Sequence, residues 1–178
     1  MEYLDILDKK GNKTGEIKTR EEVHAKGYWH KAVYICIINS KGEILLQRRS
    51  KDKNIFPNKL DLSVGGHPVS GENELEGLKR EVLEEIGLNL NNTKLEYLFT
   101  FSNKYTDGKF IDNQYLDVYL AEMNFDINKL NLQKEEVSEV KKIYYKEFEK
   151  MLKNRNDEIV PFQKAWKKLC DILDKIYN

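Results

Sequence analysis

One spaced pattern of glycine, arginine and glutamate constrains this chain more than any other feature of its sequence. Residues 66–88 read GHPVSGENELEGLKREVLEEIGL, which is a glycine, five residues, a glutamate, seven residues, and then Arg-Glu-apolar-x-Glu-Glu-x-Gly-apolar. Seven positions require one residue type and two require an apolar residue. At usual residue frequencies of roughly 5–8%, a chance match at a given start is on the order of one in a billion. The segment predicts a loop, a helix over residues 73–86 and a helix stop at Gly87.

This predicted helix carries three glutamates on one side. Successive helical residues are about 100° apart, so Glu81, Glu84 and Glu85 share a face. Three neighbouring carboxylates repel one another unless a cation lies among them, and oxygen ligands are those that Mg²⁺ or Mn²⁺ prefers. We therefore expect a divalent metal ion at these side chains. The alternative is a surface helix with an ordinary glutamate cluster.

The other side of the same helix is expected to pack on a sheet. Leu75, Val82 and Ile86 fall away from the glutamates and can be buried together. Gly77 projects onto the acidic side, where a glycine costs about 1 kcal/mol of helix stability. We expect its missing side chain to leave room for a metal-bound phosphate.

Length and charge limit the classes of protein that fit. The 178 residues suit one domain, residues 1–178. Thirty basic and thirty acidic residues cancel, so no net field attracts nucleic acid or an anionic membrane, and neither is expected as a partner. The longest apolar run is too short to span a bilayer, and the charged N-terminus lacks a signal peptide's apolar core, so we expect a cytoplasmic protein.

Apolar periodicity and turn residues predict one α/β domain with strands and helices mixed along the chain. Strands are expected at residues 3–7, near 15–18, and at 30–38, 43–48, 61–64, 95–101, 110–122 and 137–145. Helices are expected at residues 19–26, 73–86, 146–152 and about 161–177. The last of these is amphipathic and begins with Pro161, so we expect it to pack on the body of the domain.

The pattern of residues 66–88 is the Nudix box, and the chain resembles Nudix hydrolases. The resemblance implies an α/β/α sandwich with a central mixed β-sheet and a loop-helix-loop catalytic motif. It also implies Mg²⁺-dependent cleavage of the diphosphate linkage of a small organic diphosphate, with Mn²⁺ as a possible substitute. Family members are often dimers, so a homodimer is possible by analogy.

The resemblance also assigns roles to residues of the box. Glu81, Glu84 and Glu85 are expected to bind the metal ion, together with the carbonyl oxygen of Gly66. Arg80 is expected to orient these carboxylates through a salt bridge with Glu72 or with a core glutamate.

The box leaves the general base open. The candidates are Glu81 and three glutamates around the last strand: Glu135, Glu136 and Glu139. Gly87 is interpreted as a helix stop and not as a catalytic residue.

Residues outside the box resemble one branch of the family, which includes isopentenyl-diphosphate isomerase. The resemblance rests on His30-Lys-Ala, on residues 45–50, on the loop containing Pro57 and on residues 65–68. The isomerase requires a cysteine at the position of Gly65 and two glutamates where this chain has Asp112 and Gln114. Its own box is degraded, whereas this one is intact, so hydrolysis is the favoured prediction. An isomerase-like enzyme and a silent diphosphate-sensing module are the alternatives.

The branch resemblance indicates further contacts to the substrate. His30 and His67 match metal ligands of the isomerase, and His24 lies near a third, one residue short in spacing; a structural role is the alternative. The basic residues after residue 47 are expected to hold the diphosphate or to lie in solvent: Arg48, Arg49, Lys51 and Lys53. Nucleoside diphosphate derivatives and isoprenoid diphosphates both fit as substrates.

Overall fold

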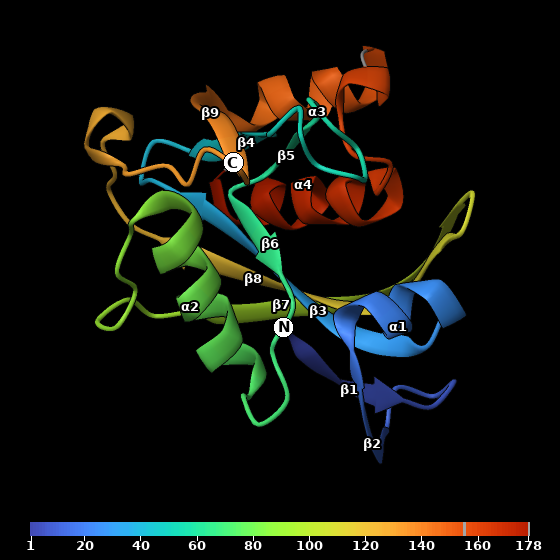
Figure 1. The fold of residues 1–178 in the computed structure, drawn as a ribbon. Coiled ribbons are helices and arrows are strands. Elements are labelled where there is room, and N and C mark those ends of the chain that lie inside the picture. Colours follow the sequence, from blue (N-terminus) through green and yellow to red (C-terminus); the bar gives the residue numbers. More distant parts are fainter. Residues whose placement is uncertain (155, 178) are drawn as a thin grey trace.

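The computed structural model describes residues 1–154 and 156–177, in which nine strands form one mixed sheet between helices (Figure 1). The strands are β1 (Tyr3–Leu7), β2 (Lys13–Thr19), β3 (Trp29–Ile38), β4 (Glu43–Arg49), β5 (Leu60–Leu62), β6 (Val64–Gly66), β7 (Glu96–Asp107), β8 (Phe110–Glu122) and β9 (Val137–Tyr144). The α-helices are α1 (Arg20–Lys26), α2 (Glu74–Ile86), α3 (Tyr145–Asn154) and α4 (Gln163–Tyr177). Two short 3₁₀ helices are Ile127–Lys129 and Asn156–Glu158.

Strand β3 lies at the centre of the sheet. It pairs in parallel with β8 along its whole length, and β8 pairs antiparallel with β7. On its other side β3 pairs with β6 in the middle, where Val33 is opposite Gly66, and with β1 and β4 near its two ends. Strand β4 in turn carries β5 and β9. This arrangement brings Gly66, the first residue of the box, to the middle of the sheet.

The two faces of the sheet are covered by different helices (Figure 1). Because successive strand residues point to opposite faces, Val33 and Ile35 pack toward α2, while Tyr34 and Cys36 pack toward α3 and α4. Trp166 of α4 is fully buried in the second of these cores. The expected α/β class with a mixed central sheet is thereby confirmed. Among the described helices, none has both the length and the apolar character needed to cross a bilayer.

Three differences from the expected element boundaries have a clear structural reason. Strand β7 continues to Asp107, because pairing with β8 extends through a polar segment without apolar periodicity. The strand expected at residues 61–64 is two strands, since β5 pairs with β4 and β6 pairs with β3. Helix α4 begins at Gln163 and not at Pro161, and Trp166 N–H donates its hydrogen bond to Phe162 O.

Candidate active site

Helix α2 begins and ends at residues that cap it. The Asn73 side chain accepts a hydrogen bond from the Glu76 N–H at 3.0 Å, and the Glu76 carboxylate accepts one from the Asn73 N–H at 2.9 Å. This capping box satisfies N–H groups of the first turn. At the other end Gly87 has a left-handed φ of 70°, a conformation that glycine adopts without strain. Caps at both ends fix the extent of the helix and therefore the positions of its glutamates.

The buried side of α2 differs in one residue from the predicted set. Val82 and Ile86 are buried as expected, together with Leu78. Leu75 is 40% exposed, so the prediction that it packs on the sheet was wrong. Leu75 has nearly the same helical angle as Val82 but lies in the first turn, where it is only partly covered. Periodicity predicts the side of a helix and not how far along its axis the sheet extends.

Two glycines allow close approaches around the glutamates. A Cβ on Gly66 would lie 2.4 Å from Glu81 Cδ, so Glu81 occupies the space that a side chain at Gly66 would need. A Cβ on Gly77 would lie 2.8 Å from the backbone Cα of Pro68. Gly77 therefore lets the loop after β6 pack on α2. The expected room for a phosphate at Gly77 is filled by Pro68, and that prediction was wrong.

The three glutamates of α2 line one cavity but differ in depth. Glu85 is only 6% exposed and accepts a hydrogen bond from Gln47 Nε2 at 3.3 Å. Glu81 is mostly buried, whereas the Glu84 side chain is 53% exposed. The carboxylates therefore extend from the interior of the cavity to its rim.

Burial raises the pKa of the two inner carboxyl groups. The pKa of Glu85 rises to about 8, because burial disfavours the carboxylate and because Glu81 and Glu136 add negative charge nearby. The pKa of Glu81 also rises through burial, against the opposing effect of Arg80. Buried carboxylates of this kind ionise readily only when a cation lies beside them. An oxygen-only donor set with this electrostatic character fits a divalent metal ion.

Arg80 joins the glutamates to the loop that precedes the helix. Its Nε and Nη2 donate to the two carboxylate oxygens of Glu72 at 2.8 and 3.0 Å. Its Nη1 donates to Glu81 at 3.0 Å and to Glu84 at 3.2 Å, and Nη2 also donates to His67 O at 3.0 Å. The planar guanidinium suits such paired contacts. Both partners expected for Arg80, Glu72 and the core glutamates, are therefore present together.

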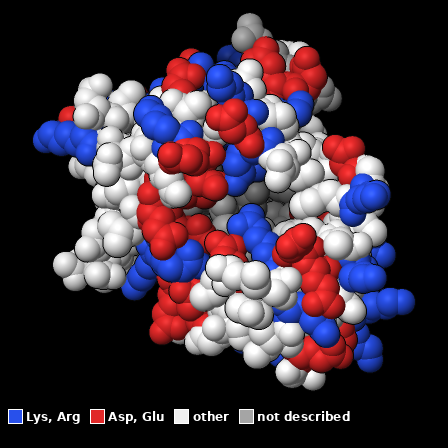
Figure 2. All heavy atoms as spheres, viewed as in Figure 1, with Lys and Arg blue, Asp and Glu red and all other residues white. Residues whose placement is uncertain are grey.

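The cavity beside these residues has a volume of about 770 Å³, within the range of roughly 300–1,000 Å³ usual for small-molecule sites. Figure 2 shows a hollow near the middle of this face, with acidic side chains gathered beside it. Besides the glutamates, the lining includes the cationic residues Arg20, Arg49, Lys53 and Lys109, and the aromatic residues Tyr34, Phe56, Phe110 and Phe162.

Only some of the basic residues predicted to bind substrate lie at the cavity. Arg49 and Lys53 line the cavity, but Arg48 is not part of its lining. Arg48 instead pairs through Nε with Glu139 at 3.2 Å and donates through Nη1 to Asn58 O at 2.8 Å. Neighbouring strand residues point to opposite faces, which separates Arg48 from Arg49. The structure thus corrects the grouping of Arg48 with the substrate contacts.

Of the three candidate general bases around β9, two line the cavity and one does not. Glu135 and Glu136 line the cavity, and Glu136 forms an ion pair with Lys53. Glu139 is not part of the lining and pairs with Arg48. Glu135 and Glu136 therefore face the same cavity as the glutamates of α2.

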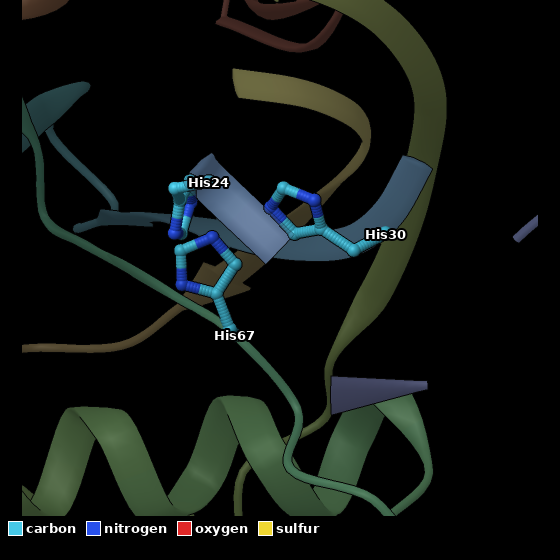
Figure 3. A group of neighbouring side chains, drawn as sticks. All are labelled: His24, His30 and His67. Atoms are coloured by element: carbon cyan, nitrogen blue, oxygen red, sulfur yellow. The ribbon is translucent and has the colours of Figure 1, made fainter. Parts of the chain in front are cut away.

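Three histidines from separate elements meet beside the same cavity, and two of them, His24 and His67, line it. His24 comes from α1, His30 from β3 and His67 from the loop after β6, and Figure 3 shows their rings grouped closely together. One ligand atom of each lies within 4.8 Å of the others. Asp112 Oδ1 lies 3.4 Å from His30 Nε2 and 3.8 Å from His24 Nε2. His24 therefore lies close to His30 and His67, although its spacing in the sequence is one residue shorter than in the isomerase.

Burial keeps this histidine cluster neutral. It lowers the pKa of all three rings, that of His30 to about 4. The Nδ1 atoms of His24 and His30 contact the carbonyl oxygens of Arg20 and Tyr28 at 2.8 and 3.1 Å. A neutral ring that donates through Nδ1 has a lone pair at Nε2. Within the described chain, the buried Nε2 atoms of His30 and His67 and Oδ1 of Asp112 have no hydrogen-bond partner.

Sequence reasoning missed several residues around the cavity. Gln47 follows the apolar trio 44–46 and interrupts it on the face that Leu45 shares, which is a signal that could have been used. Asp61 is a polar residue between two leucines of a short buried strand, which is a similar signal. Arg20 and Lys109 carry no such signal, because only the fold brings α1 and the β7–β8 turn to the cavity.

Comparison with known proteins identifies the family. A family model described as the NUDIX domain matches residues 28–163, which is most of the chain. The chain belongs to the Nudix hydrolase family. It is 39% identical over 179 residues to Nudix hydrolase 3 of Arabidopsis thaliana, covering 97% of this chain and 23% of that protein. It is 34% identical over 164 residues to an uncharacterised Nudix hydrolase of Listeria monocytogenes, covering 91% and 90% of the two chains.

The fold of this Nudix hydrolase has counterparts among solved structures. A crystal structure of a protein from Deinococcus radiodurans superposes with a TM-score of 0.71 at 21% identity, covering 99% of this chain and 100% of the other. The family assignment agrees with the resemblance inferred from the box. The general reaction of Nudix hydrolases is hydrolysis of a pyrophosphate bond. Nudix hydrolases generally use divalent metal ions. The chain spans 23% of the length of the plant relative, so it corresponds to only part of that protein.

Proposed function

We propose that this Nudix hydrolase is a Mg²⁺-dependent enzyme that cleaves the diphosphate linkage of a small organic diphosphate. One observation carries the proposal: Glu81, Glu84 and Glu85 line the same 770 Å³ cavity, next to Gly66. A cavity of this size accommodates a small organic molecule with two phosphates. Nucleoside diphosphate derivatives and isoprenoid diphosphates are both candidate substrates.

The three glutamates and the Gly66 carbonyl oxygen would hold the metal ion. Mg²⁺ would neutralise charge on the diphosphate and lower the pKa of the attacking water, and Mn²⁺ could replace it. The raised pKa of Glu85 supports this role, because a divalent cation would stabilise its carboxylate. Arg80 would hold Glu81 and Glu84 in position through its ion pairs with them, while Glu72 would anchor Arg80 to the loop before α2.

The reaction transfers one phosphoryl group to water. The oxygen of a water molecule attacks phosphorus, the P–O bond to the bridging oxygen breaks, and the water loses a proton to a general base. Glu81, Glu135 and Glu136 are the candidates for this base, because all three line the cavity. Lys53 would contact the phosphate oxygens with its positive charge, as expected for diphosphate binding. Arg49 also lines the cavity, but its guanidinium donates to the carbonyl oxygens of Ile55 and Phe56, so it would act on the cavity wall.

His30 and His67 are proposed, with His24, to bind a second cation or a substrate phosphate beside the box. The grouping of three neutral rings and the unpaired Nε2 atoms support this role. Asp112 adds a carboxylate, whereas Gln114, its neighbour on the same strand face, supplies only an amide. A structural hydrogen-bonded cluster is the competing interpretation. Metal analysis of the purified protein and of its His30→Gln variant separates the two.

An isomerase is a weaker candidate, because a cysteine at position 65 conflicts with the surrounding structure. A Cβ on Gly65 would lie 2.4 Å from the Tyr34 ring, so the residue that the isomerase requires has no space here. A silent sensing module is also weaker, because all three glutamates proposed to bind the metal ion, Glu81, Glu84 and Glu85, are present and line the cavity. Formation of a monophosphate product would exclude both alternatives.

The test is phosphate release from a panel of diphosphates by purified protein with and without Mg²⁺. We expect turnover of at least one organic diphosphate in wild type, and its loss in both Glu84→Gln and Glu85→Gln with the circular dichroism spectrum retained. Glu74→Gln is the matched control, because Glu74 lies on α2 but outside the cavity lining. Retained turnover in both E84Q and E85Q would reject the proposed site. Binding without any phosphate release by wild type would favour the sensing module.

A further inference from the structure

The loop between β4 and β5, residues 50–59, forms part of the cavity wall and contains two non-glycine residues with a left-handed backbone. Phe56 has a φ of 50° and Asn58 a φ of 59°. Asparagine tolerates this conformation, whereas a bulky residue such as phenylalanine adopts it only where neighbouring contacts impose it. Of these two residues, Phe56 lines the cavity and Asn58 does not. The strained position is therefore the one that faces the site.

The Phe56 ring belongs to an aromatic section of the wall. Its centroid lies 4.6 Å from that of Tyr105 and 6.2 Å from that of Phe162, and Phe162 lies 6.0 Å from Tyr34. This section adjoins the glutamates, because the Tyr34 ring fills the space beside Gly65, the residue before Gly66. Phe56, Phe162 and Tyr34 thus provide an apolar surface next to the carboxylate end of the cavity.

Arg49 fixes the backbone that carries Phe56. Its Nε donates to Ile55 O and Phe56 O, both at 3.2 Å, and its Nη2 donates to Ile55 O at 2.9 Å. The planar guanidinium therefore holds two consecutive carbonyl oxygens of the loop, which a lysine could not do with the same geometry. These contacts account for the conformation imposed on Phe56.

Asp61 in β5 holds Arg49 in turn. Its side chain is 1% exposed, and its Oδ2 lies 3.8 Å from Arg49 Nη1 and accepts a hydrogen bond from the Tyr34 hydroxyl at 3.3 Å. Its Oδ1 accepts a hydrogen bond from the Leu62 N–H at 2.9 Å. A carboxylate buried this deeply requires such partners. Asp61 therefore connects two residues of the cavity wall, Arg49 and Tyr34, to strand β5.

We propose that Phe56 determines specificity for the organic group of the diphosphate, and that Arg49 and Asp61 are positioning residues that act through loop 50–59. The inference rests on the proposed hydrolase function and narrows its substrate class. The organic group would present an apolar or aromatic surface to Phe56, Phe162 and Tyr34, while the phosphates face the glutamates of α2. Packing of an organic group in such a pocket is worth roughly tenfold or more in kcat/KM.

The experiment compares benzyl diphosphate with methyl diphosphate as substrates. We expect wild type to prefer the benzyl compound in kcat/KM by roughly tenfold, and Phe56→Gly to lose most of this preference. Asn58→Gly is the matched control, because it relieves the same backbone conformation in the same loop without removing a ring from the wall. It should keep the wild-type preference. An unchanged preference in F56G, or an equal loss in N58G, would overturn the inference.

The positioning role is tested by Asp61→Asn and, should that variant not fold, by Arg49→Lys. We expect either substitution to lower the benzyl preference through a higher KM for benzyl diphosphate, which loss of stability alone would not produce. An unchanged preference in a folded D61N or R49K protein would reject the positioning role.

The two proposals fail in different ways. Wild type that turns over neither diphosphate of this pair nor any other organic diphosphate would overturn the proposed function and this inference together. Turnover without discrimination between benzyl and methyl diphosphate would overturn the inference alone.

Discussion

Arg80 illustrates how a single side chain organises the candidate site. It makes five hydrogen bonds to Glu72, Glu81, Glu84 and the His67 carbonyl oxygen, so it links the helix to the loop that precedes it. Asp61 has a similar supporting role, because it contacts Arg49 and Tyr34, which line the cavity. Both residues are partly or fully buried and touch other side chains of the site. Their effects on activity should therefore exceed those of surface charges.

Arg80→Lys should lower kcat while the protein remains folded. Lysine keeps the positive charge but cannot contact Glu72 in a bidentate manner and reach Glu81 at the same time. Loss of such orienting contacts around metal ligands typically costs about 10–100-fold. Steady-state kinetics with Mg²⁺ measures the effect, and Lys79→Ala on the same helix is the control. A kcat equal to that of wild type would contradict the role given to Arg80.

Asp61 should make stability depend on pH in a defined direction. Burial raises its pKa from 3.8 to about 6, against the opposing effect of Arg49. Between these values the folded state binds more protons than the unfolded state, so this group lowers the free energy of unfolding as pH rises through the window. The full effect is on the order of 3 kcal/mol. This decrease in the free energy of unfolding is absent below pH about 4 and complete above pH about 6.

Urea unfolding of wild type and Asp61→Asn at several pH values measures this effect. Since asparagine does not titrate, the stability of the variant relative to wild type should rise between pH 4 and pH 6 and then level off. A difference that is constant over this range would show that Asp61 ionises in the folded state as it does in the unfolded state.

At the scale of elements, α2 and the loop before it form one unit. The helix is capped at Asn73 and Gly87, and Gly77 allows the loop to approach it at Pro68. Strand β6 enters the same unit, because Gly66 makes space for Glu81. The position of the carboxylates therefore depends on contacts between three consecutive segments and not on the helix alone.

Gly77→Ala should impair this unit although alanine is the better helix former. In an isolated helix the change would add about 1 kcal/mol of stability. Here the new Cβ would lie 2.8 Å from the Pro68 backbone, so the loop leading back to Gly66 has to move. We expect no gain in the free energy of unfolding and a lower kcat. Leu83→Ala, at an exposed position of the same helix, controls for a general effect of substitution; a G77A protein with higher stability and full activity would contradict the packing argument.

At the scale of the whole molecule, the sheet separates two apolar cores. One lies under α2 and contains Leu78 and Val82, and the other lies under α3 and α4 and contains Trp166 and Leu169. The box glutamates belong to the first side. The second core lies on the opposite face of the sheet (Figure 1). Its members Tyr34 and Phe162 line the cavity, whereas Leu169 does not, so damage at Leu169 should affect stability more than chemistry.

Leu169→Ala should separate stability from activity. Truncation of a fully buried leucine leaves a cavity and lowers the free energy of unfolding by about 2–5 kcal/mol. Activity per folded molecule should remain near that of wild type at temperatures well below the unfolding transition. Thermal unfolding and kinetics at low temperature measure the two quantities, with Ile176→Ala, 46% exposed on the same helix, as control. A fall in kcat without loss of folded protein would mean that α4 acts on the site.

Local features of the site could be predicted from the sequence. The stop of α2 at Gly87 and the shared face of its glutamates follow from residues near one another in the chain. The pairing of Arg80 with Glu72 was one of the two partners that the family resemblance implied. Predictions of contacts between different elements of the fold were less successful. Leu75 was assigned to the buried side, Gly77 was given a phosphate as neighbour in place of Pro68, and Arg48 was grouped with Arg49.

By itself, the sequence determined the family, the α/β class and the identity of the box carboxylates, because these depend on residue types at fixed short spacings. The branch resemblance pointed to His30 and His67 as possible ligands, but only the tertiary structure decided that His24 and Asp112 join them and that Asp61 holds Arg49 and Tyr34. These groups come from segments far apart in the chain, and their distances depend on strand pairing and helix packing. Helical and strand periodicity gives the direction of each side chain, but not the partner that it will face.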